Sequence, residues 1–254
     1  MRVAVLADIH GNLPALEAVL HDVDAAGVDV IVLNGDLVTG PMPAEALSLL
    51  ESLGERAVWV RGNADREVVN AYDGTLTPDL HPAAIPPTEY AATEISREQR
   101  DRLAGLPLDV SLDLDGLGPV RFCHATTRSD TEIVLVDSPV ARFAECFPGV
   151  EEQIVVLGHT HMAFDRLADR RRFVNPGSVG MPYGNPGAHW ALLGPAVTLC
   201  RTAYDLQAAA ALMRARAAGY PGIEEFLAQN LLSVPSDSVV LEAFGPKSPS
   251  EARA

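Results

Sequence analysis

Residues 3–12 read VAVLADIHGN, and this stretch decides the fold class. Residues 3–7 form a short apolar run rich in β-branched side chains, which is typical of a strand buried on both faces. Asp8, His10 and Asn12 follow this run directly. Because ligands of open α/β sheets bind beyond the carboxyl ends of the strands, the stretch predicts a buried strand that delivers polar side chains to a sheet edge.

The same pattern of an apolar run followed by polar residues and glycine returns along the chain. The further predicted strands are residues 30–34, 57–60, 120–123 and 154–157. The polar residues that follow them are, in order, Asp36 after Gly35, Asn63 after Gly62, His124, and His159 and His161 after Gly158. Each motif alone is typical of an ordinary turn or a surface histidine. Together, the five strand ends predict one shared site.

Helical patterns lie between and after these strands. Leu16, Val19, Leu20 and Val23 have helical spacing, and Asn12 is the predicted N-cap. Further helices are predicted over residues 44–53, 97–106, 206–218 and 223–232, and later strands over residues 108–114, 163–167, 172–174, 190–193 and 197–201. This order predicts an α/β protein in which two sheets pack face to face with helices outside.

The chain shows no internal repeat and no clean linker, so a single domain over residues 1–244 is the hypothesis. Residues 73–92 are a proline-rich insertion, predicted to be irregular, and serve either as a lid or as a passive insertion. Residues 205–232 hold the C-terminal helices. The tail at 245–254 is rich in proline, serine and charge and is predicted to be flexible.

Composition limits the classes of function. The net charge of −15 disfavours stable nucleic-acid binding, because the surface repels polyanions. Three cysteines without CxxC spacing argue against a disulfide framework or a zinc-thiolate site. No segment approaches the roughly 18 apolar residues of a membrane span. The apolar run at residues 3–7 stops at Asp8, too early for a secretory signal, so the protein is expected in the cytoplasm.

The predicted site holds oxygen and nitrogen donors, which suit divalent ions such as Mn, Fe or Zn rather than thiolate-preferring metals. The candidate ligands are Asp8, His10, Asp36, Asn63, His124, His159 and His161. Seven ligands exceed one tetrahedral site but suit two metals that share a carboxylate. Two metals about 3.5–4 Å apart can hold a phosphate and activate a nucleophile.

This ordered motif set resembles the calcineurin-like metallophosphoesterase superfamily over roughly residues 1–200. The turn Asn175-Pro176-Gly177-Ser178 is similar to that of its small bacterial and archaeal branch of YfcE-like phosphodiesterases. The resemblance implies a four-layer α/β/β/α sandwich of two mixed β-sheets flanked by helices. The turn at 175–178 would shape the pocket or brace His161, or is simply a turn.

The resemblance also implies roles for the ligands. Asp8, His10 and His161 would bind the first metal, and Asn63, His124 and His159 the second. Asp36 would bridge the metals together with a hydroxide that attacks phosphorus. Asp36, Asn63, His124 and Asp65 form the expected catalytic set. The metals implied are two divalent ions from Mn, Fe, Zn, Ni or Co, with Mn the first choice in vitro.

One position departs from the family pattern. Many members carry a histidine directly after the asparagine, as a general acid, whereas this chain has Ala64. Asp65 either replaces that acid or orients a neighbour. Because a general acid contributes about 10²–10⁴-fold, activated or diester substrates are expected to react better than alkyl monoesters.

Four residues are candidates for contact with the substrate. Arg128 and Arg66 are candidates for pairing with a phosphate oxygen, although exposed arginines are also common on any surface. Asn12 and Asn63 complete the predicted substrate-binding set.

The leading hypothesis is a dinuclear-metal phosphoesterase acting on phosphodiester or nucleotide-type small molecules. Serine/threonine protein phosphatase and dinucleoside polyphosphate hydrolase are the enzymatic alternatives, and a metal-binding interaction scaffold is the non-enzymatic one. A homodimer formed through the strands near Val197 is a further hypothesis.

Overall fold

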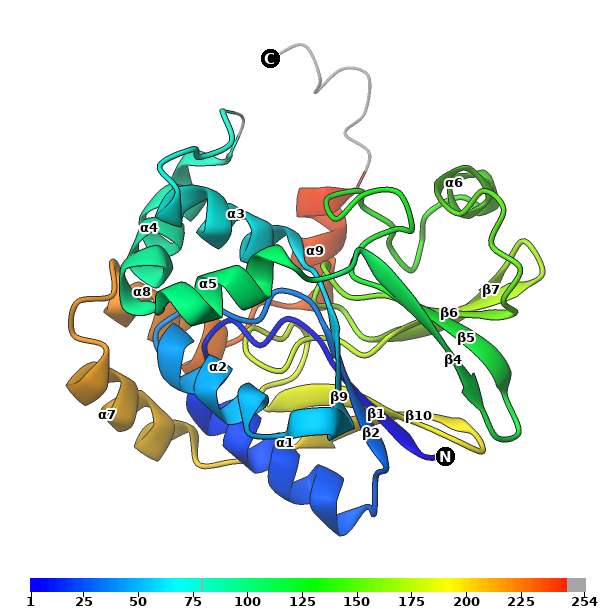
Figure 1. Cartoon of the computed structure of the whole chain (residues 1–254), viewed down its shortest axis with the longest axis horizontal. Helices are drawn as coiled ribbons and strands as arrows, with labels where there is room; N and C mark the ends of the chain where they lie inside the picture. Colours follow the sequence, from blue (N-terminus) through cyan, green and yellow to red (C-terminus); the bar gives the residue numbers. More distant parts are fainter. Residues whose placement is uncertain (79, 246–254) are drawn as a thin grey trace.

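The stretch at residues 3–12 begins with the middle strand of the first of two five-stranded sheets and continues into the loop beyond that strand's carboxyl end (Figure 1). The computed structural model describes residues 1–78 and 80–245. The strand order is β10 (Val197–Thr202), β9 (Ala188–Leu193), β1 (Val3–Leu6), β2 (Val30–Asn34) and β3 (Ala57–Val60). β1, β2 and β3 are parallel, whereas β9 and β10 are antiparallel additions. The carboxyl ends of the three parallel strands therefore meet at one edge.

The second sheet is also mixed. Its order is β4 (Asp109–Leu114), β5 (Gly118–Cys123), β6 (Ile154–Val156), β8 (Arg171–Asn175) and β7 (Phe164–Ala168). β5, β6 and β8 are parallel, and the outer strands β4 and β7 pair with them in the antiparallel direction. The predicted architecture of two mixed sheets is confirmed.

The two sheets pack face to face through alternate residues of their strands. Val3 and Val5 of β1 point into this core and meet Phe122 and Val156 of the second sheet. The intervening residues of β1 point instead to the helices that cover the other face of the first sheet. A strand buried on both faces explains why residues 3–7 are apolar without alternation.

Helices form the outer layers. The first sheet is covered by α1 (Leu13–Ala25), α2 (Pro43–Glu51), α3 (Asn63–Tyr72), α4 (Ile85–Glu94) and α5 (Arg97–Ala104). α1 begins where predicted, because the Asn12 side chain accepts a hydrogen bond from Ala15 N (3.2 Å). On the other side, α6 (Val140–Cys146) packs Phe143 on Phe173 of β8, and Figure 1 shows it beside the second sheet.

The segment at 73–92 is more regular than predicted. It holds a short 3₁₀ turn, Pro82–Ala84, and most of α4. Pro86 and Pro87 lie in the first turn of α4, where a missing backbone N–H costs no helical hydrogen bond. α4 packs on α3 and α2. A lid role for this segment stays a prediction.

Other helices also escaped prediction, namely α3, α6 and α9 (Asp237–Phe244). The two predicted C-terminal helices are present with altered detail. α7 (Leu206–Arg216) ends two residues before its predicted end, residues 217–222 form a turn, and α8 (Ile223–Phe226) continues as a π-helix, Leu227–Leu232. The predicted flexible tail lies, apart from Gly245, outside the described residues. In residues 1–78 and 80–245, no helix has the length and apolar character that a membrane crossing requires.

Candidate active site

The strand ends of both sheets bring the seven predicted ligand side chains together. Asp8 and Asp36 follow β1 and β2, and Asn63 begins α3 after β3. His124 follows β5, and the loop after β6 carries His159 and His161. Two groups of carboxylate and imidazole side chains result, each with its ligand atoms within 4.8 Å of one another. They are Asp8, His10, Asp36 and His161, and Asp36, His124 and His159.

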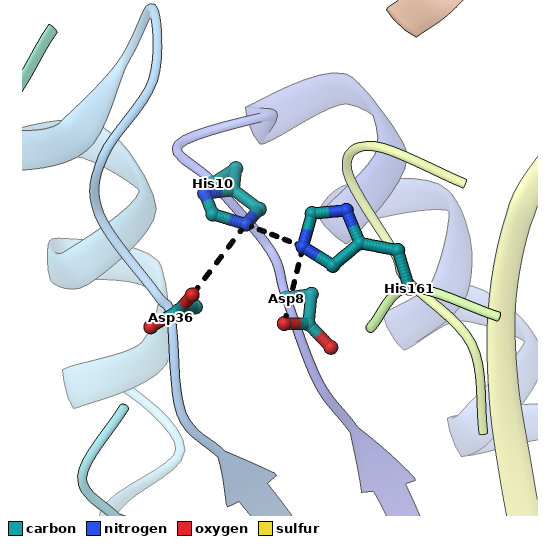
Figure 2. A group of neighbouring side chains, drawn as sticks. All are labelled: Asp8, His10, Asp36 and His161. Atoms are coloured by element: carbon teal, nitrogen blue, oxygen red, sulfur yellow. Dashed lines mark hydrogen bonds and ion pairs between the residues drawn. The ribbon is translucent and has the colours of Figure 1, made fainter. Parts of the chain in front are cut away.

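Asp36 is the member common to both groups. Its Oδ1 lies 3.3 Å from His124 Nε2, and its Oδ2 lies 3.8 Å from His10 Nε2. Asp8 Oδ1 lies 3.3 Å from His161 Nε2. Figure 2 shows the first group, with the imidazoles of His10 and His161 facing each other above the two carboxylates. These side chains are almost entirely buried.

Main-chain carbonyl groups fix the direction of three imidazoles. Nδ1 of His10 lies 3.0 Å from Thr39 O, Nδ1 of His124 lies 2.9 Å from Asn34 O, and Nδ1 of His161 lies 2.9 Å from Met181 O. A carbonyl oxygen only accepts, so each Nδ1 carries a proton and each Nε2 is directed at the cluster, where its unprotonated form can ligate a cation. These carbonyl partners have no signature in the sequence, because any residue type supplies them.

The arrangement of the lone pairs fits a bound cation. Nε2 of His10 and Nε2 of His161 lie 3.0 Å apart. With both Nδ1 atoms protonated, this contact is repulsive unless a proton or a cation lies between the lone pairs. Imidazole nitrogens oriented in this way by a second hydrogen bond are usual in metal sites. The first group therefore fits a divalent cation.

The side chain of Asn63 lies beside the second group. Its side-chain Oδ1, rather than its nitrogen, faces the imidazole nitrogens of His124 and His159, at 3.2 Å from His124 Nε2. A protonated His124 Nε2 donates to this oxygen, and the reversed amide would instead donate to both imidazoles. In either orientation the Asn63 amide lies against the imidazoles of His124 and His159, within reach of a cation bound by them.

The backbone at the site is strained. Among the described residues, seven other than glycine have φ in the left-handed region, and five of these are candidate ligands. The five are Asp8 (φ 55°), His10 (49°), Asp36 (54°), His159 (67°) and His161 (57°). Such conformations cost of order 1 kcal/mol or more each and concentrate at functional sites. The folded structure thus holds the ligand positions in place at a cost in stability.

Glycines permit the close backbone packing that these turns require. A Cβ built on Gly40 would lie 1.7 Å from the carbonyl oxygen of His10, and one on Gly180 would lie 1.9 Å from that of Ile9. Both distances are far inside van der Waals contact. The loop that carries Asp8 and His10 is therefore clamped between two backbone segments that have no room for a side chain.

Asp65 lies directly behind Asp36 and is fully buried. Its Oδ2 accepts from Asp36 N (2.9 Å) and Gly62 N (3.0 Å), and its Oδ1 accepts from Leu37 N (2.8 Å). Of the two roles considered for Asp65, these contacts favour orientation of a neighbour over proton donation. Burial and the charge of Asp36 raise the pKa of Asp65 to about 7, although the amide donors act in the opposite sense.

Charge is balanced within the cluster. Burial lowers the pKa of His124, but the Asp36 and Asp8 carboxylates outweigh it and raise that pKa to about 10. Burial and the nearby His124 lower the pKa of His159 to about 4. Burial favours the neutral form of Asp36, yet His124 and His10 hold its pKa far below the usual range. The buried carboxylates are therefore balanced by positive charge beside them, which the protonated His124 supplies and a bound cation would also supply.

The 175–181 segment braces the first group from behind. Asn175 Nδ2 donates to Gly158 O (2.7 Å), and Ser178 Oγ donates to Asp8 O (2.7 Å). Of the alternatives considered for this turn, these contacts favour bracing, although they reach Asp8 and the loop at Gly158 and not His161 itself. Asn12 is fully buried and donates to Gly180 O (3.0 Å) besides capping α1. Its predicted contact with substrate stays a prediction that these bonds do not support.

The two predicted phosphate-binding arginines are occupied by carboxylates. Arg66 Nε donates to Asp130 Oδ2 (2.9 Å), an acid that sequence reasoning missed because no motif marks it. Arg128 forms bonds of 2.6–3.2 Å with Glu132, and its side chain is 43% exposed. Either arginine would have to leave its partner to reach a phosphate, and both roles stay predictions.

Comparison with known proteins agrees with fold and site. A family model described as the calcineurin-like phosphoesterase superfamily domain matches residues 1–195. The phosphodiesterase YfcE of Escherichia coli K12 is 27% identical over 203 residues, which cover 76% of this chain and 87% of that protein. The fold and the buried Asp/His cluster define a metal-dependent phosphoesterase. The chain belongs to the calcineurin-like phosphoesterase superfamily, as the motif resemblance predicted.

Two solved structures are similar over almost their whole length. A metallophosphoesterase from Sphaerobacter thermophilus is 29% identical with a TM-score of 0.71, covering 91% of this chain and 99% of that one. A hypothetical protein from Pyrococcus horikoshii is 21% identical with a TM-score of 0.77, covering 92% and 99%. The second likeness concerns the fold alone.

Proposed function

We propose that this protein hydrolyses small phosphodiesters or nucleotide-type phosphate esters, using two divalent cations held by the seven clustered side chains. The observation that carries the proposal is the geometry of the two ligand groups, which share Asp36 and each gather their ligand atoms within 4.8 Å of one another. Cations bound there would neutralise phosphate oxygens and lower the pKa of an attacking water. Asp8, His10 and His161 would hold one cation, and Asn63, His124 and His159 the other.

The chain's own residues position this chemistry. The carbonyl groups of Thr39, Asn34 and Met181 keep the imidazoles pointed inward. Asp65 fixes the loop that carries Asp36. Manganese is the cation we propose to test first, because the donors are oxygen and nitrogen.

The site offers no proton donor at position 64. Ala64 uses its backbone N–H to bond Asp36 Oδ1 (2.7 Å), and its methyl group cannot protonate a departing alkoxide. Leaving groups that are stable as anions need no such help. This supports activated esters and diesters as the preferred substrates, and the name of the relative YfcE, a phosphodiesterase, supports the same preference.

We also propose a small-molecule substrate, a cytoplasmic location and a homodimer. The net charge of −15 supports a small phosphorylated substrate rather than nucleic acid. Cys123, Cys146 and Cys200 are free thiols, which supports the reducing cytoplasm. β10 is an edge strand of the first sheet, where a dimer through residues near Val197 would form.

A substrate panel tests the function. We expect the manganese-loaded protein to hydrolyse bis(p-nitrophenyl) phosphate and a cyclic nucleotide at least tenfold faster in kcat/KM than a plain alkyl monoester, because unassisted departure of an alkoxide loses roughly 10²-fold or more. Release of nitrophenolate, nucleotide or inorganic phosphate is measured, together with bound metal by mass spectrometry. Clear preference for the alkyl monoester contradicts the diester proposal, and absence of both metal and turnover favours the scaffold.

Restoring a proton donor at position 64 is a second test. Ala64→His is expected to raise kcat/KM for the alkyl monoester by about 10²-fold while changing the p-nitrophenyl diester little, because only the poor leaving group needs general-acid help. Ala64→Gln, of comparable size but unable to act as a general acid, is the matched control. Equal effects of both variants on both esters would show that position 64 does not face the leaving group.

A further inference from the structure

Tyr183 stands beside the first ligand group, on the loop between β8 and β9. It lies two residues after Met181, whose carbonyl oxygen holds His161. Its ring centroid is 5.8 Å from that of His161, with the planes inclined by 41°. Tyr183 was not part of the predicted site, because no motif in the sequence includes it.

The ring of Tyr183 is held by apolar neighbours that include the C-terminal helix. It packs on an apolar cluster formed by Met162, Leu135 and Val240 of α9. The next residue, Gly184, donates its N–H to Pro235 O (2.8 Å), just before α9. The C-terminal helix thereby fixes an aromatic residue at the border of the metal cluster, although the family match ends at residue 195.

The hydroxyl group of Tyr183 has no partner among the hydrogen bonds of the described residues. The buried polar atoms without a partner in the described part of the chain do not include this hydroxyl, so it is reached by solvent and is open to a ligand that enters the site. An ordinary phenol is a neutral O–H donor near neutral pH, because its pKa is about 10. Of the other polar residues considered for substrate, Asn12, Arg66 and Arg128 are already bonded, and Asn63 is a candidate metal ligand.

We propose that the Tyr183 hydroxyl donates a hydrogen bond to a phosphate oxygen of the substrate on the side of the cluster formed by His10 and His161. This inference rests on the proposed function, since it supposes that the cluster receives a phosphate group. It assigns Tyr183 as a substrate-binding residue and α9 as the element that positions it.

The test compares Tyr183→Phe with Tyr72→Phe. The first removes the hydroxyl and keeps the ring; the second makes the same change at an exposed tyrosine that ends α3. The manganese-loaded proteins are titrated with inorganic phosphate by calorimetry and assayed with bis(p-nitrophenyl) phosphate. Tyr183→Phe is expected to weaken phosphate binding and raise KM by about tenfold, because a bond to a charged acceptor is lost, with kcat and metal content little changed.

The outcomes separate this inference from the proposed function. Equal phosphate affinity and KM in the two variants would overturn the role of Tyr183. Loss of metal from Tyr183→Phe would also overturn it, because the residue would then support His161 and not the substrate. If the wild-type protein binds manganese and phosphate but hydrolyses no ester, the proposed function fails, while the affinity comparison still decides the role of Tyr183.

Discussion

Asp36→Asn is expected to lower kcat/KM for phosphoester hydrolysis by about 10³-fold or more. Asparagine has nearly the same shape but no charge, and one of its oxygens is replaced by an amide N–H₂. Asp36 is the residue that both ligand groups share, with one oxygen directed to each group. Removing the shared anion withdraws several kcal/mol of transition-state stabilisation, and about 4 kcal/mol corresponds to 10³-fold in rate.

Metal analysis shows whether this loss has the expected cause. We expect Asp36→Asn to bind fewer cations than the wild type at equal manganese concentration, while retaining the fold by circular dichroism. Asp113→Asn, at an exposed position in β4, is the control for removal of one negative charge. Full metal content with activity within tenfold of wild type would show that Asp36 is not the bridging ligand.

Asp65→Asn is expected to reduce kcat/KM by about 10²-fold for every ester and to destabilise the fold by about 3 kcal/mol. The aspartate accepts three backbone N–H groups. The amide oxygen of asparagine can replace only one of the two carboxylate oxygens. At least one backbone N–H then faces the side-chain N–H₂ group and lacks an acceptor, which costs about 1–3 kcal/mol. The loop that carries Asp36 then shifts, and misplacement by about 1 Å costs roughly 10²-fold.

The dependence on leaving group distinguishes orientation from proton donation by Asp65. Rates are measured on a series of aryl and alkyl esters, and stability by urea unfolding. A uniform loss with lowered stability supports orientation. A loss that grows steeply with leaving-group basicity, in a protein of unchanged stability, would instead identify Asp65 as the general acid.

The sequence predicts the sheets and the grouping of ligands well, for a common physical reason. Strands such as residues 3–7 are buried on both faces, so their apolar runs are unbroken and easily located. The polar residue after each run is then placed by the parallel pairing of strands, as with Asp8 and Asp36. The structure brings all seven candidates together, and their individual metal assignments stay predictions.

Features that depend on contacts between distant parts of the chain could not be predicted from the sequence pattern. α3 begins with Asn63 and Asp65, whose side chains serve the site, so its first turn lacks an apolar signal. The proline-rich part of α4 reads as irregular until its packing on α3 is seen. Arg66 looked free because Asp130, its partner, is remote in sequence. The left-handed backbone at His159 could not be predicted either, because the residue is not a glycine or an asparagine, the types that usually adopt this conformation.

The tight fit of Gly40 and Gly180 against the loop of residues 8–10 affects how this protein tolerates sequence change. A mutational scan scored by turnover would rank both positions beside the ligands, although neither carries a group that can reach ion or ester. A side chain at either position would push the loop of residues 8–10 away and displace the ligands Asp8 and His10. Variants aimed at new substrates should therefore change residues at the entrance of the site and keep glycine at positions 40 and 180.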